Sequence, residues 1–441
     1  MSVVVQIIEN KENYWMPFTA NAGFKLDPRM VQRAEGMYYY DAKERRILDS
    51  CAGLYTHAAG HCHPAVVAAV EEQVRNLDYA MAFQFGHPGA FELAAKVAEL
   101  TPGNLNKVFF TNSGSEAVET SLKIALNYHA ARGESQRTRF VGREKGYHGV
   151  NFGALSVGGI ARNKNGFGAG LPNVHHMRNA YLPEYRFTKG QPEEGVEFAD
   201  DLEQIVQTYG ADTIAACIVE PIAGSAGIFV PPQGYLQRLR EICDAHGILL
   251  IFDEVICGFG RTGSAFGAQS FGVTPDIITM AKALTNGTIP MGAVACDTFL
   301  YDAIAKGKAE NVVELFHGYT FSGHPVACAA GIAALNVYRD ENLFERANKL
   351  SGEFREIVFG LNDLNIVRDI RSYGLLAGID LEPGESPGDR GYELMRTCFD
   401  KGLVLRTSGD TFVLAPALIA EKTQLEEMIS IIRKSLSKWA A

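Results

Sequence analysis

The chain has 441 residues, of which 47% are apolar and 21% are charged, so it can build a large hydrophobic core and about two domains. Its net charge is −10 and its pI is near 5.6, and no basic cluster offsets that balance. This argues against a general nucleic-acid or anionic-membrane binder, because contact with phosphates needs a basic surface.

The eight cysteines are scattered and none forms a CxxC pair, so neither a zinc cage nor a thioredoxin-type site is predicted. Residues 1–15 lack the basic flank and the apolar length of a signal peptide. No apolar stretch reaches the length of a membrane span. We therefore expect a protein of the reducing cytoplasm.

The first predicted elements belong to an irregular segment, residues 1–62, with a hairpin-like piece at 37–41 and 46–49. Helical periodicity follows at 63–77 and 90–100. Strands and helices then alternate. The expected strands are 107–111, 139–143, 214–220, 249–253, 277–280 and 292–296, and the expected helices are 115–132, 233–246 and 300–306. Continuous apolar runs predict strands covered on both faces, in a mostly parallel α/β sheet.

The pattern changes after about residue 325. Helical stretches at 325–337 and 341–359 precede short strands and a final helix at 424–439. We expect three parts: an N-terminal segment (1–62) that completes the small domain, a large α/β domain (63–324), and a small C-terminal α+β domain (325–441).

One cation, Lys282, ends the apolar run in PDIITMAKALTNG (275–287). Desolvation there lowers the pKa of a lysine and yields the neutral amine that a Schiff base requires. The simpler alternative is a cation that snorkels to water, and the stretch alone favours it. Asp253 ends another apolar run, LLIFD, at the strand end where open α/β sheets bind ligands. A metal ligand or a helix cap also explains Asp253.

The stretch TNSGSEAVE (111–119) places a Ser-Gly-Ser turn between a strand and a helix. Ser113, Gly114 and Ser115 then lie where the first amides of the helix are unpaired, which makes an anion pocket. A plain helix cap by Ser115 explains the same residues at least as well.

Four more stretches allow a functional and a structural interpretation. Tyr147 in GYHG can stack on a flat ring or lie in a turn. HGYTFSGHP (317–325) can bind phosphate or act as a linker, and alone it favours the linker. Arg406 in LRTSGD can pair with a carboxylate or form a structural ion pair. AGHCHP (59–64) has two histidines without distant partners at ligand spacing, so no metal site is predicted.

In chain order, the Ser-Gly-Ser turn, GYHG, VEPIAGSAG, IFDEV, MAKALTNG and HGYTFSGHP together resemble the class III aminotransferases. These are fold-type I enzymes that use pyridoxal 5′-phosphate (PLP). The resemblance extends from WMPFTANAGFK (15–25) to the strand of Arg406. WMPFTA and FQFGHP (83–88) are most similar to the ω-amino acid:pyruvate (β-alanine:pyruvate) aminotransferases. It implies a seven-stranded-type, mostly parallel sheet in the large domain.

The resemblance also implies residue roles. Lys282 would be the Schiff-base lysine and the acid/base that moves the proton, and Asp253 would pair with the pyridinium nitrogen. Other cofactor contacts would come from Ser113, Gly114, Ser115, Tyr147, His148, Glu220, Val255 and, from a neighbouring subunit, Thr320. The substrate would meet Arg406, which binds its carboxylate, and a pocket of Phe18, Leu54, Tyr55, Phe83 and Tyr147.

The implied activity is ping-pong transfer of an amino group from an ω-amino acid or a primary amine to pyruvate, giving alanine and an aldehyde or ketone. The implied assembly is a homodimer with shared sites, which can pair further into a tetramer. Alternatives are another donor or acceptor, such as taurine or 2-oxoglutarate, a decarboxylase or an aminomutase on the same fold, and a non-catalytic descendant. The presence of both Lys282 and Asp253 counts against the last.

Two departures from the family pattern concern specificity. Members that use 2-oxoglutarate often carry VEPIQGE, whose last acid gates the substrate arginine, whereas this chain has Ala223 and Ser225. We expect Arg406 to move more freely and pyruvate to be preferred over 2-oxoglutarate. Tyr55 stands where the ω-amino acid:pyruvate enzymes usually have tryptophan, so the pocket is expected to differ.

Overall fold

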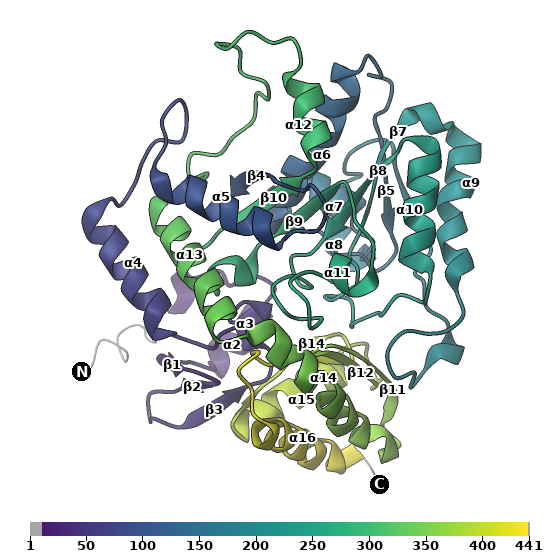
Figure 1. Ribbon diagram of the computed structural model, residues 1–441. Coiled ribbons are helices and arrows are strands. Elements are labelled where there is room, and N and C mark those ends of the chain that lie inside the picture. Colours follow the sequence, from purple (N-terminus) through teal and green to yellow (C-terminus); the bar gives the residue numbers. More distant parts are fainter. Residues whose placement is uncertain (1–10, 440–441) are drawn as a thin grey trace.

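The computed structural model describes residues 11–439 (Figure 1). Its largest sheet has seven strands in the order β4-β10-β9-β8-β7-β5-β6. Their bounds are β4 Lys107–Thr111, β5 Arg139–Arg143, β6 Val174–Met177, β7 Ile214–Val219, β8 Leu249–Asp253, β9 Ile277–Met280 and β10 Gly292–Cys296. All six strands expected from the sequence occur, and β6 is an additional one.

The strands β5, β6, β7, β8 and β9 are parallel to one another, and β10 runs antiparallel to both β9 and β4. The expected mostly parallel α/β fold is therefore confirmed. Successive residues of β8 point into different cores: Ile251 belongs to the cluster that includes α6 (Gly114–Ala131), whereas Leu250 and Phe252 belong to the main core. Burial on both faces explains why these strands are continuous apolar runs.

Two four-stranded sheets lie at the other end of the molecule. One joins β1 (Arg33–Glu35), β2 (Tyr38–Tyr40), β3 (Arg46–Asp49) and β13 (Leu403–Val404). The other joins β11 (Val367–Tyr373), β12 (Leu376–Leu381), β14 (Arg406–Ser408) and β15 (Thr411–Leu414). The parallel pairing of β3 with β13 joins the N-terminal segment to the C-terminal part of the chain, as the neighbouring purple and yellow-green ribbons of Figure 1 show. This pairing supports the predicted domain grouping, which stays a proposal.

The remaining helices cover the sheets and join them. α4 (Pro64–Asn76) and α5 (Pro88–Leu100) pack against α13 (Pro325–Asp340), which also touches the turn η5 (Lys282–Thr285). The large sheet is also flanked by α9 (Asp200–Tyr209), α10 (Tyr235–His246) and α12 (Thr298–Ala305). The C-terminal sheets carry α14 (Leu343–Phe359), α15 (Asp389–Asp400) and α16 (Lys422–Leu436). The helices expected from periodicity occur within a few residues of their expected bounds.

Within residues 11–439, no helix is both long and apolar enough to cross a membrane. The expectation about a signal peptide concerns residues 1–15, of which 1–10 lie outside the described part.

Candidate active site

The carboxyl ends of neighbouring strands open into a cavity of about 570 Å³. Glu220 directly follows β7, Asp253 ends β8, and Lys282 comes two residues after β9. The other predicted site residues that line this cavity are Phe18, Leu54, Tyr55, Gly114, Ser115, Tyr147, His148, Val255 and Arg406. The structure thus gathers residues from eight separate parts of the chain at the sheet edge where α/β folds bind ligands.

Lys282 is held in an unusual backbone conformation. Its φ is 50°, in the left-handed region that bulky residues rarely adopt. The turn after it ends at Asn286, whose side chain accepts from the amide of Ala59 at 2.8 Å and donates to the carbonyl of Gly60 at 2.9 Å. Burial lowers the pKa of Lys282 to about 8, against the opposing effect of the Asp253 carboxylate. The lysine is therefore a partly neutral amine near neutral pH.

Asp253 is a buried carboxylate fixed from two sides. Its Oδ2 lies 2.8 Å from Nδ1 of His148, and its Oδ1 accepts from the amide of Val255 at 3.1 Å. His148 is only 2% exposed, and its Nε2 has no hydrogen-bond partner among the described residues. This arrangement orients one negative charge toward the cavity, where it suits a cation or a protonated ring nitrogen.

Glu220 ties the GYHG loop to β7. Its two carboxylate oxygens accept from the amides of Tyr147 and Gly224, each at 2.9 Å. Burial raises the pKa of Glu220. The carboxylate therefore positions Tyr147, whose ring borders the cavity.

The Ser-Gly-Ser turn caps an 18-residue helix, α6. Ser113 accepts from the amide of Glu116 at 3.2 Å, and Ser115 Oγ accepts from the amide of Val150 at 3.0 Å. The backbone of Gly149 passes so close that a Cβ there would lie 2.4 Å from Ser115 Oγ. The predicted cap by Ser115 is wrong, because Ser113 caps the helix and Ser115 binds the amide of Val150 instead. An anion-binding helix end is also compatible with this geometry.

Arg406 reaches the cavity from β14 and donates from Nη1 to the hydroxyl of Tyr55 at 3.1 Å. It forms no ion pair with any residue of 11–439. Ser225, which replaces the gating acid of related sequences, lines the same cavity. Phe18 and Leu54 are exposed at its edge.

His61 of AGHCHP has a structural role. His61 Nε2 lies 2.7 Å from Oδ2 of buried Asp49, and the same carboxylate accepts from the amides of Cys51 and Gly53. Within the described residues, no group of three or more ligand side chains surrounds a possible metal position.

Ser113, the N-cap of α6, does not line this cavity, and two further predicted residues, Phe83 and Thr320, lie outside it. Both are exposed, and they belong to adjoining loops: Tyr79 donates to the carbonyl of Thr320 at 3.0 Å, and Phe83 lies against Gly318. Their predicted roles therefore require a second subunit and stay predictions.

Several site residues were missed by sequence reasoning. Ile160, Arg162 and Asn163 line the cavity from a glycine-rich stretch without periodicity, and Thr407 and Ser408 follow Arg406. Glu254 is fully buried behind the site and accepts from the amides of Gly267 and Ala268 at 2.7 and 2.6 Å. Among these residues, only Glu254 could have been found from the sequence, because it is a second acid directly after a buried apolar strand.

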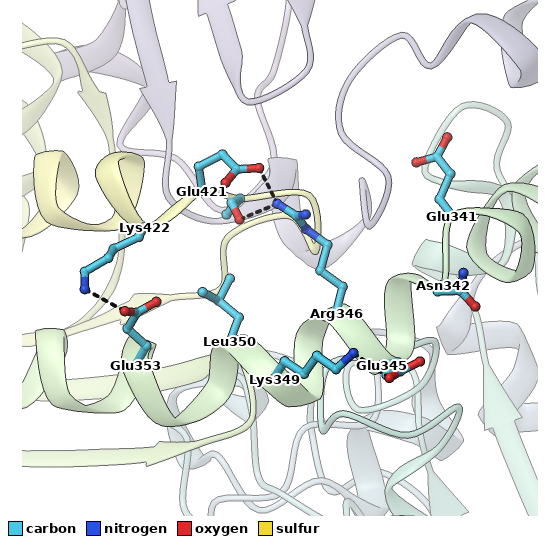
Figure 2. A pocket seen from close by; sticks show the side chains of 10 residues that line it. Glu341, Asn342, Glu345, Arg346, Lys349, Leu350, Glu353, Glu421 and Lys422 are labelled. Atoms are coloured by element: carbon cyan, nitrogen blue, oxygen red, sulfur yellow. Dashed lines mark hydrogen bonds and ion pairs between the residues drawn. The ribbon is translucent and has the colours of Figure 1, made fainter.

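A second hollow of about 420 Å³ lies between α14 and the start of α16 (Figure 2). Its charges pair with one another: Arg346 with Glu421, Lys349 with Glu345, and Lys422 with Glu353. These exposed pairs make a solvated surface rather than a reactive site.

Comparisons with known proteins agree with one another. The family model described as aminotransferase class-III matches residues 20–436. An omega-aminotransferase of Caulobacter vibrioides is 52% identical over 96% of this chain and 97% of its own length. An omega-amino acid–pyruvate aminotransferase of Pseudomonas putida is 44% identical over 96% and 95%. A solved (S)-enantioselective omega-transaminase from Thermomicrobium roseum has a TM-score of 0.93 at 33% identity and covers 99% of both chains. A PLP-bound amine transaminase from an uncultivated Pseudomonas species has a TM-score of 0.90 at 34% identity, over 97% and 99%.

Proposed function

Since this chain belongs to the class III aminotransferases, we propose that it transfers the amino group of an ω-amino acid or a primary amine to pyruvate. The names of two relatives, an omega-amino acid–pyruvate and a beta-alanine–pyruvate aminotransferase at 44% and 45% identity, support this substrate class. The observation that carries the proposal is Lys282, a buried amine with a pKa of about 8 that lines the same cavity as the buried carboxylate of Asp253. We still expect the protein to act in the cytoplasm.

The cavity fits PLP. The buried carboxylate of Asp253 suits a protonated ring nitrogen, and Tyr147 and Val255 border the space where a flat ring would lie. The α6 terminus with Ser113, Gly114 and Ser115 suits a phosphate, and the bare backbone of Gly149 leaves room for it. When bound, PLP supplies an aldehyde that takes the amino group and a ring that accepts the electrons released by proton removal.

The chain's own residues then have distinct tasks. The Lys282 amine takes the proton from the carbon that carries the donor's amino group and returns it elsewhere, because near neutral pH it exists in both protonation states. Asp253, whose two oxygens are oriented by His148 and by the amide of Val255, would stabilise positive charge on the ring. Arg406 binds the carboxylate of pyruvate or of a carboxylate-bearing donor.

We further propose a homodimer in which each subunit completes the other's site. Exposed large apolar side chains gather on the adjoining loops 77–91 and 306–324: Leu77, Tyr79, Met81, Phe83, Phe85, Phe91, Val312, Val313, Phe316 and Phe321. An apolar surface of this kind suits burial against another chain. It would place Thr320 and Phe83 at the partner's cavity.

The test is alanine formation by the holoenzyme from pyruvate and a panel of amines that includes β-alanine. We expect activity in the wild type and in Lys349→Ala, a matched control in the second hollow, and none in Lys282→Ala. A wild type that makes no alanine with any donor would refute the proposal. Replacing pyruvate with 2-oxoglutarate tests the acceptor. Equal activity with both would contradict the preference for pyruvate that we attribute to Ser225.

A further inference from the structure

Arg406 has an unusual set of neighbours for a half-buried cation. Among the described residues its guanidinium has one side-chain hydrogen bond, to the hydroxyl of Tyr55 at 3.1 Å. Its positive charge acts to lower the pKa of Tyr55, Tyr147, Lys282 and the thiol of Cys51, so these groups lie near it. None of these is a carboxylate, so Arg406 keeps its charge available for an anionic ligand in the cavity.

The Tyr55 hydroxyl has an unused donor. A phenol can accept and donate at once, and here the oxygen accepts from Arg406 while the structure gives its proton no acceptor among residues 11–439. Burial raises the pKa of Tyr55 to about 12, so the proton stays in place at physiological pH. Two basic side chains lie close to the ring, with Lys282 Nζ at 5.3 Å and Arg406 Cζ at 5.6 Å from its centroid.

The backbone fixes where this hydroxyl lies. Tyr55 is 1% exposed and has a φ of 63°, and Ala52 and Gly53 before it also have positive φ values of 46° and 69°. The carboxylate of Asp49, paired with His61, holds this turn through the amides of Cys51 and Gly53. Such a conformation persists only when its surroundings impose it, so the hydroxyl is a fixed point rather than a mobile side chain.

We propose that Tyr55 is a specificity-determining residue that acts with Arg406 as one receptor for the substrate carboxylate. Its hydroxyl anchors the guanidinium at the cavity and donates its own proton to the same carboxylate. The receptor favours ω-amino acids and pyruvate over amines and aldehydes without a carboxylate, because those leave Arg406 and the hydroxyl unpaired in a desolvated place. This inference deepens the proposed function and rests on it.

The test removes one oxygen. Tyr55→Phe keeps the buried ring, and Tyr128→Phe is the matched control, because Tyr128 on α6 also accepts from an arginine, Arg132, but outside the cavity. Two measurements are made on each holoenzyme. Calorimetry gives the Kd of propionate, a carboxylate without an amino or keto group. Steady-state rates compare pyruvate with propanal as acceptors.

For Tyr55→Phe we expect the propionate Kd and the KM of pyruvate to rise about tenfold, the effect of one hydrogen bond to a charged group. Propanal kinetics and the kcat with pyruvate should change less than about threefold, and Tyr128→Phe should match the wild type in both. In protein that already carries Arg406→Gln, adding Tyr55→Phe should raise the propionate Kd by a smaller factor, since the two residues act as a unit.

An unchanged propionate Kd would overturn the proposal. So would an equal loss with pyruvate and propanal, which would make Tyr55 a support of the fold. A wild type that forms no alanine would overturn the proposed transamination alone, and the propionate measurement would then still decide the role of Tyr55.

Discussion

The pKa of Lys282 can be measured by labelling its amine with acetic anhydride at a series of pH values in cofactor-free protein. Only the neutral amine reacts, so the rate follows the deprotonated fraction. With a pKa of about 8, roughly 9% of Lys282 is neutral at pH 7, against about 0.03% at the ordinary 10.5. Burial therefore gives about 300-fold more reactive amine at pH 7 than an exposed lysine has.

The assay follows the peptide that contains Lys282 by mass spectrometry. Because the folded pKa is depressed, labelling should rise with pH and reach half its maximum near pH 8, whereas the urea-unfolded protein should do so near 10.4. Asp253→Asn should move the folded midpoint lower, since the carboxylate raises the pKa of this amine. A folded midpoint near 10 would refute the assignment of Lys282 as a partly neutral amine.

Three further substitutions test the supports of the site. Gly149→Ala should weaken PLP binding at least tenfold in a fluorescence titration and cost about 1–3 kcal/mol of stability, because its Cβ would collide with Ser115, whereas Gly133→Ala, with nothing within 4 Å, should leave PLP binding unchanged. Asn286→Ala should lower the free energy of unfolding in urea by about 2–4 kcal/mol, since two buried backbone groups lose their partner, and a loss under 0.5 kcal/mol would contradict this. Arg371→Ala should cost about 3–5 kcal/mol by leaving two carboxylates without their cation, whereas Arg33→Ala should change stability little because its ion pairs are exposed, and similar losses for both would argue against a stabilising network.

Sequence patterns predicted the large sheet because its strands are buried on both faces and therefore read as unbroken apolar runs. The exception is β6, an edge strand of the sequence VHHM, whose two histidines hide it. The candidate residues Glu220, Asp253 and Lys282 could be predicted from the sequence for a related reason. Each is a charged residue that directly follows or ends such a run, where water would otherwise be excluded.

The rest of the site depends on contacts that no local pattern encodes. Tyr55 and Arg406 meet across most of the chain, and the pair Asp49–His61 supports a turn whose strain becomes visible only in three dimensions. The left-handed conformation of Lys282 is equally hidden, because lysine carries no preference for it. Phe83 and Thr320 do not line the cavity of the chain that carries them, so a single chain does not test their predicted roles.

The pairing of β3 with β13 also determines when the site is completed during synthesis. The sheet residues that suit PLP have all emerged by Lys282, whereas the wall that carries Arg406 emerges more than a hundred residues later. Domains fold as units in the order in which they leave the ribosome. With the proposed roles, a nascent chain would present the cofactor-binding face before the residues that recognise a carboxylate, and substrate selection would be the last property acquired during synthesis.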